Sequence, residues 1–284
     1  SATAPVDAGS GAWSIRGGGV IRVNASGMIT IHGALAANGG GTSTSGGSGG
    51  GVYLTCTTIA GTGGVVTANG GTGFGPSGGR GGGGGRIAVL YNPAAQASLP
   101  VPDVAFHAAG GIVTDSGGKP TGGDLGYYGD LGTLYFPDSR LLTNPLTHSG
   151  QWLAPGATSW APATLTLTNA WFRFAAGGFQ LNVTGNILAT GSDPYRYGLQ
   201  LIDGNLSCGG GITMQGSGLT MFSGGVTGPV LTANRDLVLT NSGGTTMGGM
   251  LRVHAAATNA PGPDCGALVA VGGAGVSRGT ASMR

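Results

Sequence analysis

Short apolar stretches follow directly on glycine runs at three places in the first ninety residues, in segments 17–23, 49–54 and 83–90. The apolar stretches begin at Val20, Val52 and Arg86, which are 32 and 34 residues apart. A second phrase, Ala-Asn-Gly-Gly at 37–40, returns at 68–71 after 31 residues. Two phrases that keep one period predict stacked structural units, each of which buries its apolar face only against its neighbours.

Each unit between residues 12 and 92 is predicted to hold two short strands and one glycine-rich excursion. The predicted strands are 20–23 and 28–32 in the first unit and 52–55 and 65–68 in the second, and the excursions are 39–51 and 70–85. Glycine has no side chain, so stacked excursions can approach closely in an extended, polyglycine-II-like form with three residues per turn. The alternative is that the glycine runs are mobile linkers.

A shorter rhythm begins after an irregular stretch. The phrase Leu-Thr-Leu-Thr-Asn at 165–169 has a counterpart at 237–241, 72 residues later, which equals four turns of 18. Alternating apolar positions with Gly and Asn at the corners are typical of parallel β-solenoid coils.

We therefore expect an all-β fold, a parallel β-solenoid (β-helix) with stacked glycine-rich loops. Its expected parts are glycine-rich coils with a period of about 32 residues at 1–92, an irregular junction at 93–162 and coils of about 18–22 residues at 163–284. One continuous solenoid and two domains are both compatible with this pattern.

Composition supports a chain of strands and loops. Glycine accounts for 64 of 284 residues, charged residues make up only 8%, and the chain has no Glu and a single Lys. Long amphipathic helices need charged solvent faces, and glycine inside a helix costs about 1 kcal/mol relative to alanine. Glycine does not recur at every third position, so a collagen triple helix is excluded as well.

Charge and hydropathy argue against two classes of partner. The net charge is +2, and basic residues do not interleave with aromatic ones as in a nucleic-acid groove, so we expect no nucleic acid. No apolar stretch approaches the roughly 20 residues that span a bilayer, so we expect no membrane span. The first residue is Ser1, which suggests a mature chain whose export signal has been removed, or a trimmed one.

The cysteines and histidines form no metal-binding pattern. Cys56 stands alone in the N-terminal half, whereas Cys208 and Cys265 are the candidate disulfide pair; the alternative is three buried thiols. His32, His107, His148 and His254 lie far apart in the chain. We therefore expect no metal and no cofactor.

Candidate acids for glycan cleavage lie in the predicted junction, where Asp115, Asp124 and Asp130 accompany Lys119. Paired carboxylates can act as acid and base on a glycan. The same residues lie in ordinary turn sequences, and the chain has only ten acidic residues. We assign no catalytic residue and expect the chain not to be an enzyme.

Large aromatic residues gather in the middle of the chain. Trp152, Trp160, Trp171 and Tyr195 are the candidates for stacking on sugar rings. The alternative is that such residues fill the seam between two kinds of repeat.

The glycine-to-strand phrases also carry a resemblance. Segments 47–54, 66–71, 81–91 and 132–135 resemble a glycine-rich module of large secreted bacterial proteins, and the later coils resemble β-solenoid repeats of adhesin-like surface proteins. The resemblance covers roughly residues 17–144 and implies an extracellular or cell-surface location and a structural or adhesive role.

From this we expect a self-assembling subunit of a filament, sheath or surface layer. Its partners would be copies of itself joined head to tail or related surface proteins, with polysaccharide as a further candidate. The alternatives are a glycan- or host-binding adhesin or phage tail-tip protein and, behind these, a polysaccharide-cleaving β-helix enzyme.

Overall fold

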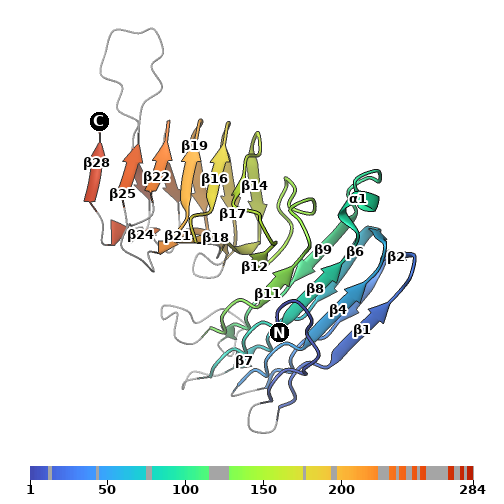
Figure 1. Cartoon of the computed structure of the whole chain (residues 1–284). Helices are drawn as coiled ribbons and strands as arrows, with labels where there is room; N and C mark the ends of the chain where they lie inside the picture. The colour runs from blue at the N-terminus through green and yellow to red at the C-terminus, as the bar shows by residue number, and fades with distance from the viewer. Residues whose placement is uncertain are drawn as a thin grey trace. The chain divides into compact units, whose positions relative to one another are not determined.

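The structure is a computed structural model. It describes residues 1–11, 15–42, 45–74, 79–114, 128–174, 177–192, 197–222 and 230–234, and the strands at 237–240, 245–247, 250–253, 268–271, 276–277 and 280–283. The chain divides into an N-terminal unit, residues 1–141 with 148–156, and a C-terminal unit, residues 142–147 with 157–284. The described chain is nearly all β, and its sheets are built from parallel pairs (Figure 1).

The N-terminal unit contains short strands and one four-residue helix, α1 (Pro93–Gln96). The strands are β1 (Val20–Asn24), β2 (Met28–Thr30), β3 (Ala34–Ala36), β4 (Gly51–Thr55), β5 (Thr58–Ala60), β6 (Thr62–Thr67), β7 (Gly73–Phe74), β8 (Arg86–Leu90), β9 (Asp103–His107), β10 (Val113–Thr114), β11 (Thr133–Tyr135) and β12 (Gly150–Leu153).

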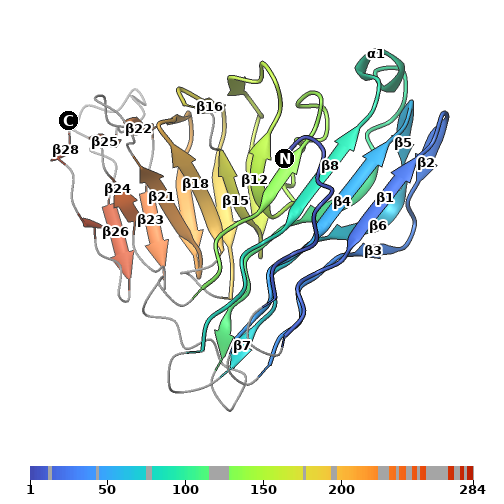
Figure 2. The same ribbon diagram turned by 60° about the horizontal axis from the view of Figure 1, so that its bottom comes forward.

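Strands of the N-terminal unit pair with their counterparts in the next repeat of the chain, and we call one such repeat a coil. The main sheet runs β1-β4-β8-β11-β12, beside a second sheet β2-β5 and a third sheet β3-β6-β9 (Figure 2). The first coil thus holds three strands and the second holds four, counting the two-residue β7, where the sequence predicted two in each. The extra elements, β3, β5 and β7, are two or three residues long, too short to show an alternating pattern.

The register differs from the predicted one by a single residue. Val20 pairs with Gly51, and Gly51 pairs with Arg86, so Val52 lies beside Ile21. This spacing agrees with the Asn38–Asn69 interval of 31 residues, in which the Asn38 side chain accepts a bond from the Asn69 amide (2.7 Å). The asparagine phrase is the better indicator of the period because its side chain bonds to the next coil.

The C-terminal unit repeats a three-strand cycle. Its strands are β13 (Ser159–Trp160), β14 (Leu165–Thr168), β15 (Trp171–Phe174), β16 (Gln180–Val183), β17 (Ile187–Thr190), β18 (Gly198–Ile202), β19 (Asn205–Cys208), β20 (Ile212–Gln215), β21 (Gly218–Phe222), β22 (Val230–Ala233), β23 (Leu237–Thr240), β24 (Thr245–Met247), β25 (Met250–Val253), β26 (Leu268–Val271), β27 (Val276–Ser277) and β28 (Thr280–Met283).

Every third strand of this unit joins the same sheet. The three sheets are β13-β16-β19-β22-β25-β28, β14-β17-β20-β23-β26 and β15-β18-β21-β24-β27. The repeated phrase at 165–169 and 237–241 falls in one column, β14-β17-β20-β23, so three coils rather than four separate its copies. Successive coils here are 22 and 25 residues apart, because their corners are longer than the turns assumed from the sequence.

Inward-facing residues form continuous apolar columns in each unit. In the N-terminal unit Val52, Ile87 and Leu134 stand in register with no exposed surface. In the C-terminal unit Leu165, Ile187 and Ile212 do the same, at 0–1% exposure. Burial of such columns between coils is the main source of stability in stacked repeats.

Candidate functional site: the glycine limbs and the aromatic core

The glycine-rich segments of the N-terminal unit run out from the third strand of a coil and back to the first strand of the next. We call 37–41, 68–73 and 108–112 the outgoing limbs, and 45–51, 80–85 and 128–132 the return limbs; residues 43 and 44 lie outside the described chain. The limbs lie side by side in both ribbon views (Figures 1 and 2).

Successive backbone amides of a return limb donate to different neighbours, and the pattern of neighbours repeats every three residues. Amides three residues apart donate to the same neighbouring limb, either the outgoing limb of their own coil or the return limb of the next coil. The bonds are Gly47 N to Gly40 O (2.8 Å), Gly50 N to Ala37 O (2.7 Å), Gly46 N to Arg80 O (2.8 Å) and Gly49 N to Gly83 O (2.9 Å). A β-strand alternates with period two, so this period of three indicates limbs with three residues per turn.

The later coils repeat the same pairing. Their own-coil bonds are Gly82 N to Gly71 O (2.9 Å), Gly85 N to Ala68 O (2.6 Å), Gly129 N to Gly111 O (3.0 Å) and Gly132 N to Ala108 O (2.7 Å). Cross-coil bonds such as Gly71 N to Gly47 O (2.8 Å) and Gly111 N to Gly82 O (2.7 Å) link the layers. The limbs therefore form a bundle held mainly by backbone hydrogen bonds, to which the side chains of Asn38 and Asn69 add bonds between successive outgoing limbs.

Close approach between limbs explains the glycine at position 82 but not the one at position 83. A Cβ atom at Gly82 would lie 2.0 Å from the carbonyl oxygen of Gly47, whereas a Cβ at Gly83 would meet nothing within 4 Å. Neither residue has φ in the left-handed region, so backbone conformation does not require glycine at either place. Glycine is needed at Gly82 because backbone from the preceding coil occupies the space of a side chain.

Aromatic residues form a stacked cluster in the core of the N-terminal unit. Trp152 is 3% exposed and stacks on Phe136 with centroids 4.5 Å apart, while Phe106 meets Phe136 edge to face at 5.1 Å. Trp152, one of the candidates for stacking on sugar rings, is thus buried among other aromatic side chains.

The other aromatic candidates differ in exposure. Trp171 is 6% exposed, and Trp160 is partly exposed and tilts against Phe174 at 6.3 Å. Phe174 in turn stacks on Phe179 at 4.2 Å. Tyr195 lies outside the described residues. Glycan stacking stays a prediction, and of the three described tryptophans Trp160 presents the most surface to solvent.

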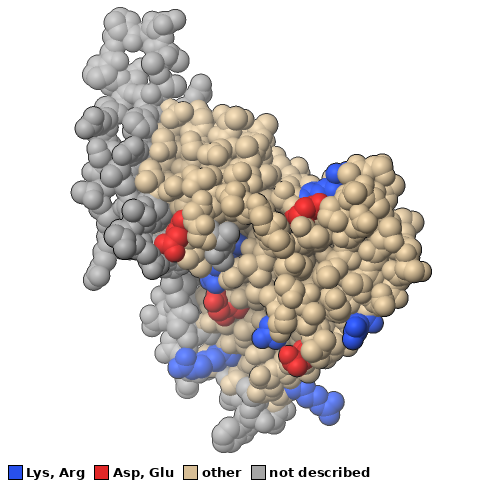
Figure 3. All heavy atoms as spheres, in the orientation of Figure 1, with Lys and Arg blue, Asp and Glu red and all other residues tan. Residues whose placement is uncertain are grey.

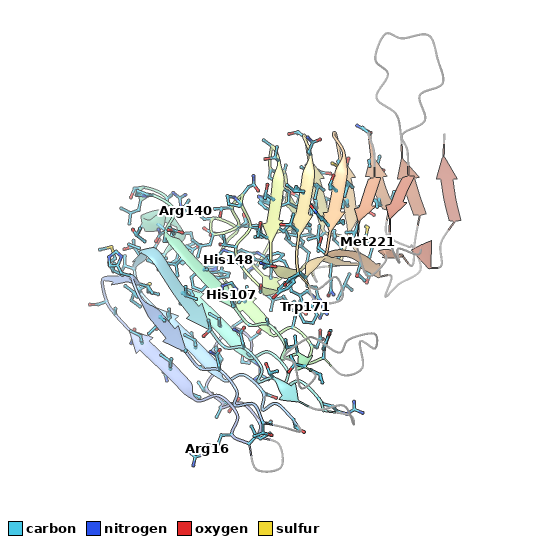
Figure 4. All side chains as sticks on the ribbon, turned by 180° about the vertical axis from the view of Figure 1, so that it is seen from behind. Arg16, His107, Arg140, His148, Trp171 and Met221 are labelled. Carbon is cyan, nitrogen blue, oxygen red and sulfur yellow. The ribbon has the colours of Figure 1, made fainter. Side chains whose placement is uncertain are left out.

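His148 lies close to His107 (Figure 4), and two hydrogen bonds hold it inside the aromatic cluster. Its Nδ1 accepts from the amide of Phe106 (3.3 Å), and Nε2 donates to the carbonyl of Leu141 (2.8 Å). Burial lowers the pKa of His148 to about 4. The bond to Leu141 acts in the opposite direction, and the nearby His107 lowers the pKa further. A neutral imidazole satisfies both bonds because one nitrogen accepts while the other donates.

Gln96 closes the edge of the β2-β5 sheet. Its side chain has no exposed surface, accepts from the amide of Ile59 (2.8 Å) and donates to the carbonyl of the same residue (3.1 Å). It thus replaces the backbone of a neighbouring strand. No local pattern in the sequence predicts this role for Gln96. The pair Asn92-Pro93 does mark the start of α1, because the Asn92 side chain caps that helix.

Tyr91, Asp138 and Arg140 connect the region around α1 to the chain after β11. The Tyr91 hydroxyl donates to Asp138, and Arg140 donates to the carbonyls of Ala97 and Leu99, both at 2.9 Å. Burial, followed by the bond to Asp138, raises the pKa of Tyr91. These ionisable groups serve local packing.

Within the described residues, Cys56 and Cys208 form no disulfide bond. Cys208 is buried, and its Sγ donates to the carbonyl of Gly185 at 3.1 Å; Cys56 is partly exposed. Burial raises the pKa of both thiols. Cys265 lies outside the described residues, so the Cys208–Cys265 disulfide stays a prediction.

The predicted acidic candidates are largely outside the described chain. Asp115, Lys119 and Asp124 are not described, whereas Asp130 is exposed and its Oδ1 accepts from the amide of Leu131 (2.8 Å). Over the ranges given above, no group of three or more His, Cys, Asp or Glu side chains could hold a metal ion. Charges of both signs are scattered over the face in Figure 3 without a large gathering of one sign.

No described helix is long and apolar enough to cross a membrane. Comparisons of the chain with protein-family models, with curated proteins and with solved structures find no match. The resemblance to bacterial surface proteins therefore stays a prediction.

Proposed function

We propose that the chain is an extracellular structural protein, a self-assembling subunit of a filament, sheath or surface layer. The observation that carries the proposal is the repeated coil-to-coil register: strand after strand pairs in parallel with its counterpart in the next coil. Such stacking builds a long, regular body by backbone pairing, and it needs no reactive side chain.

We further propose that each unit is a parallel β-solenoid. The cyclic order of the C-terminal strands supports this, because consecutive strands visit three sheets in turn and every third strand returns to the same one. The three-residue period of the limb hydrogen bonds supports polyglycine-II-like packing in the N-terminal unit. Both features would stiffen each unit with little dependence on charge.

A glycan-binding adhesin is the second candidate. The partly exposed Trp160 favours it, because an exposed indole is suited to stacking on a sugar ring. Binding on a glycan array that is lost in Trp160→Ala but retained in a variant of the buried core, such as Phe136→Leu, would favour this candidate over the structural one.

Light scattering over a wide concentration range tests the structural proposal. We expect particles much larger than the 27.4 kDa chain that persist on dilution and mild heating. A chain that stays monomeric at high concentration would contradict self-assembly.

A further inference from the structure

The first coil of the N-terminal unit is paired on one side only. Strands β1, β2 and β3 each stand at the end of their sheet, bonded to β4, β5 and β6. Along their other edge, no strand of the described ranges pairs with them. The amides and carbonyls on that edge are arranged for a further parallel coil.

Side-chain burial changes sharply between the first coil and the second. Inward-facing apolar residues of the first coil are partly exposed, whereas their register partners in the second coil have no exposed surface. The pairs are Ile21 with Val52, Val23 with Leu54, Ile29 with Ile59 and Leu35 with Val66. The apolar columns therefore end at an uncovered cross-section rather than at a polar cap.

The edge carries few of the features that natural proteins use to prevent edge pairing. The three strands contain no proline, and their one charged residue is Arg22. Its guanidinium lies over the ring of Tyr53 at 5.6 Å, toward the second coil and away from the free edge.

We propose that the open edge of the first coil pairs, in parallel register, with the last coil of a second copy of this chain. A second copy suits this edge because the edge already pairs with a coil inside the chain. Strands β4, β5 and β6 bind β1, β2 and β3 in parallel, and the first coil presents the same kind of three-strand edge on its other side. Among the described strands, β26, β27 and β28 are the last members of the three sheets of the C-terminal unit, and they offer the complementary edge. The inference rests on the proposed function and names the surface through which it acts.

Head-to-tail pairing keeps the strands parallel and leaves a new open edge after each addition. It is therefore a heterologous contact that extends without closing. Pairing of two first-coil edges with each other would be isologous and would stop at a dimer.

Two adjacent residues of β2 provide a matched test by sedimentation velocity. Ile29→Lys places a charge in the uncovered apolar column, whereas Met28→Lys places the same charge on the neighbouring, outward-facing position. We expect Ile29→Lys to weaken assembly roughly tenfold or more and Met28→Lys to leave it near the wild-type level. Ile29→Ser, a milder change, should fall between the two.

Hydrogen exchange on the unmodified chain keeps the test independent of how well a variant folds. Amides of β1, β2 and β3 should gain protection as concentration rises, while amides of the limbs remain unchanged. If the wild type assembles but Ile29→Lys assembles equally well and these amides gain no protection, the inference fails and the proposed function stands. A dimer that does not grow contradicts head-to-tail pairing, and a wild type that never assembles contradicts the proposed function itself.

Discussion

Alanine substitutions at Gly82 and Gly83 test whether the glycine limbs are tightly packed. Any general effect of replacing glycine is the same in both variants, so a difference in their stability reports the packing alone. The two residues are adjacent in one return limb, and both lack a left-handed φ. Each substitution therefore gains about the same 0.4–1 kcal/mol from the reduced freedom of the unfolded chain. Only Gly82→Ala brings a Cβ to 2.0 Å from the Gly47 oxygen, while Gly83→Ala meets open space.

The expected loss of unfolding free energy in Gly82→Ala follows from the Cβ contact that must be relieved. A real Cβ contact rarely falls below 3.0 Å, so the limb at Gly82 has to move by a large part of an ångström against backbone. Overpacking of this kind costs about 1–3 kcal/mol, and weakening the Gly82 N to Gly71 O bond adds about 0.5–1.5 kcal/mol. After the gain from the unfolded chain, Gly82→Ala should lose about 2 kcal/mol of unfolding free energy. Gly83→Ala should be unchanged or stabilised by about 0.5 kcal/mol.

Urea unfolding followed by circular dichroism measures both variants against the wild type, with the m-value checked for constancy. Equal effects of the two substitutions, in either direction, would refute the packing of the limbs, because freely moving loops would treat the two positions alike.

Three further predictions concern buried or partly exposed polar side chains. Folded His148 stays neutral, so its contribution to the unfolding free energy is fully present above pH 6.5 and declines as the pH falls toward 4. Urea titrations of the N-terminal unit should therefore show about 3 kcal/mol less unfolding free energy at pH 4 than at pH 7, and His148→Gln should reduce this difference. Gln96→Leu leaves the amide and carbonyl of Ile59 without partners and should cost about 2–4 kcal/mol, whereas an unchanged urea midpoint would contradict the edge-closing role. Alkylation of the native protein, mapped by mass spectrometry, should label the partly exposed Cys56 before the buried Cys208, and slowly at pH 7 because both pKa values are raised; faster labelling of Cys208 would contradict its burial.

The all-β, parallel fold could be predicted from the recurring phrases because these phrases mark positions that form hydrogen bonds between coils. Asn38 and Asn69 repeat at the true spacing since the side chain of one bonds to the backbone of the other. The glycine-to-strand boundary was placed one residue late at Val52, because the strand there begins with a glycine, Gly51, which has no apolar side chain to mark it.

Other features left no local trace in the sequence. The three-residue strand β3 is held by pairing with β6 of the next coil, and β5 by pairing with β2 of the preceding coil. No alternating pattern can show in so few positions. His148 and Gln96 bond to residues 42 and 37 positions away, so their roles depend on how the coils stack. Trp152 could be named as a large aromatic residue, but its burial follows from the positions of Phe136 and His148 around it.

Electron microscopy of the purified protein tests the central claim most directly. The account predicts unbranched fibres or sheets whose axial repeat matches one subunit, with coils stacked along the long axis. Isolated particles of single chains at high concentration would contradict it and would leave glycan binding as the function to test.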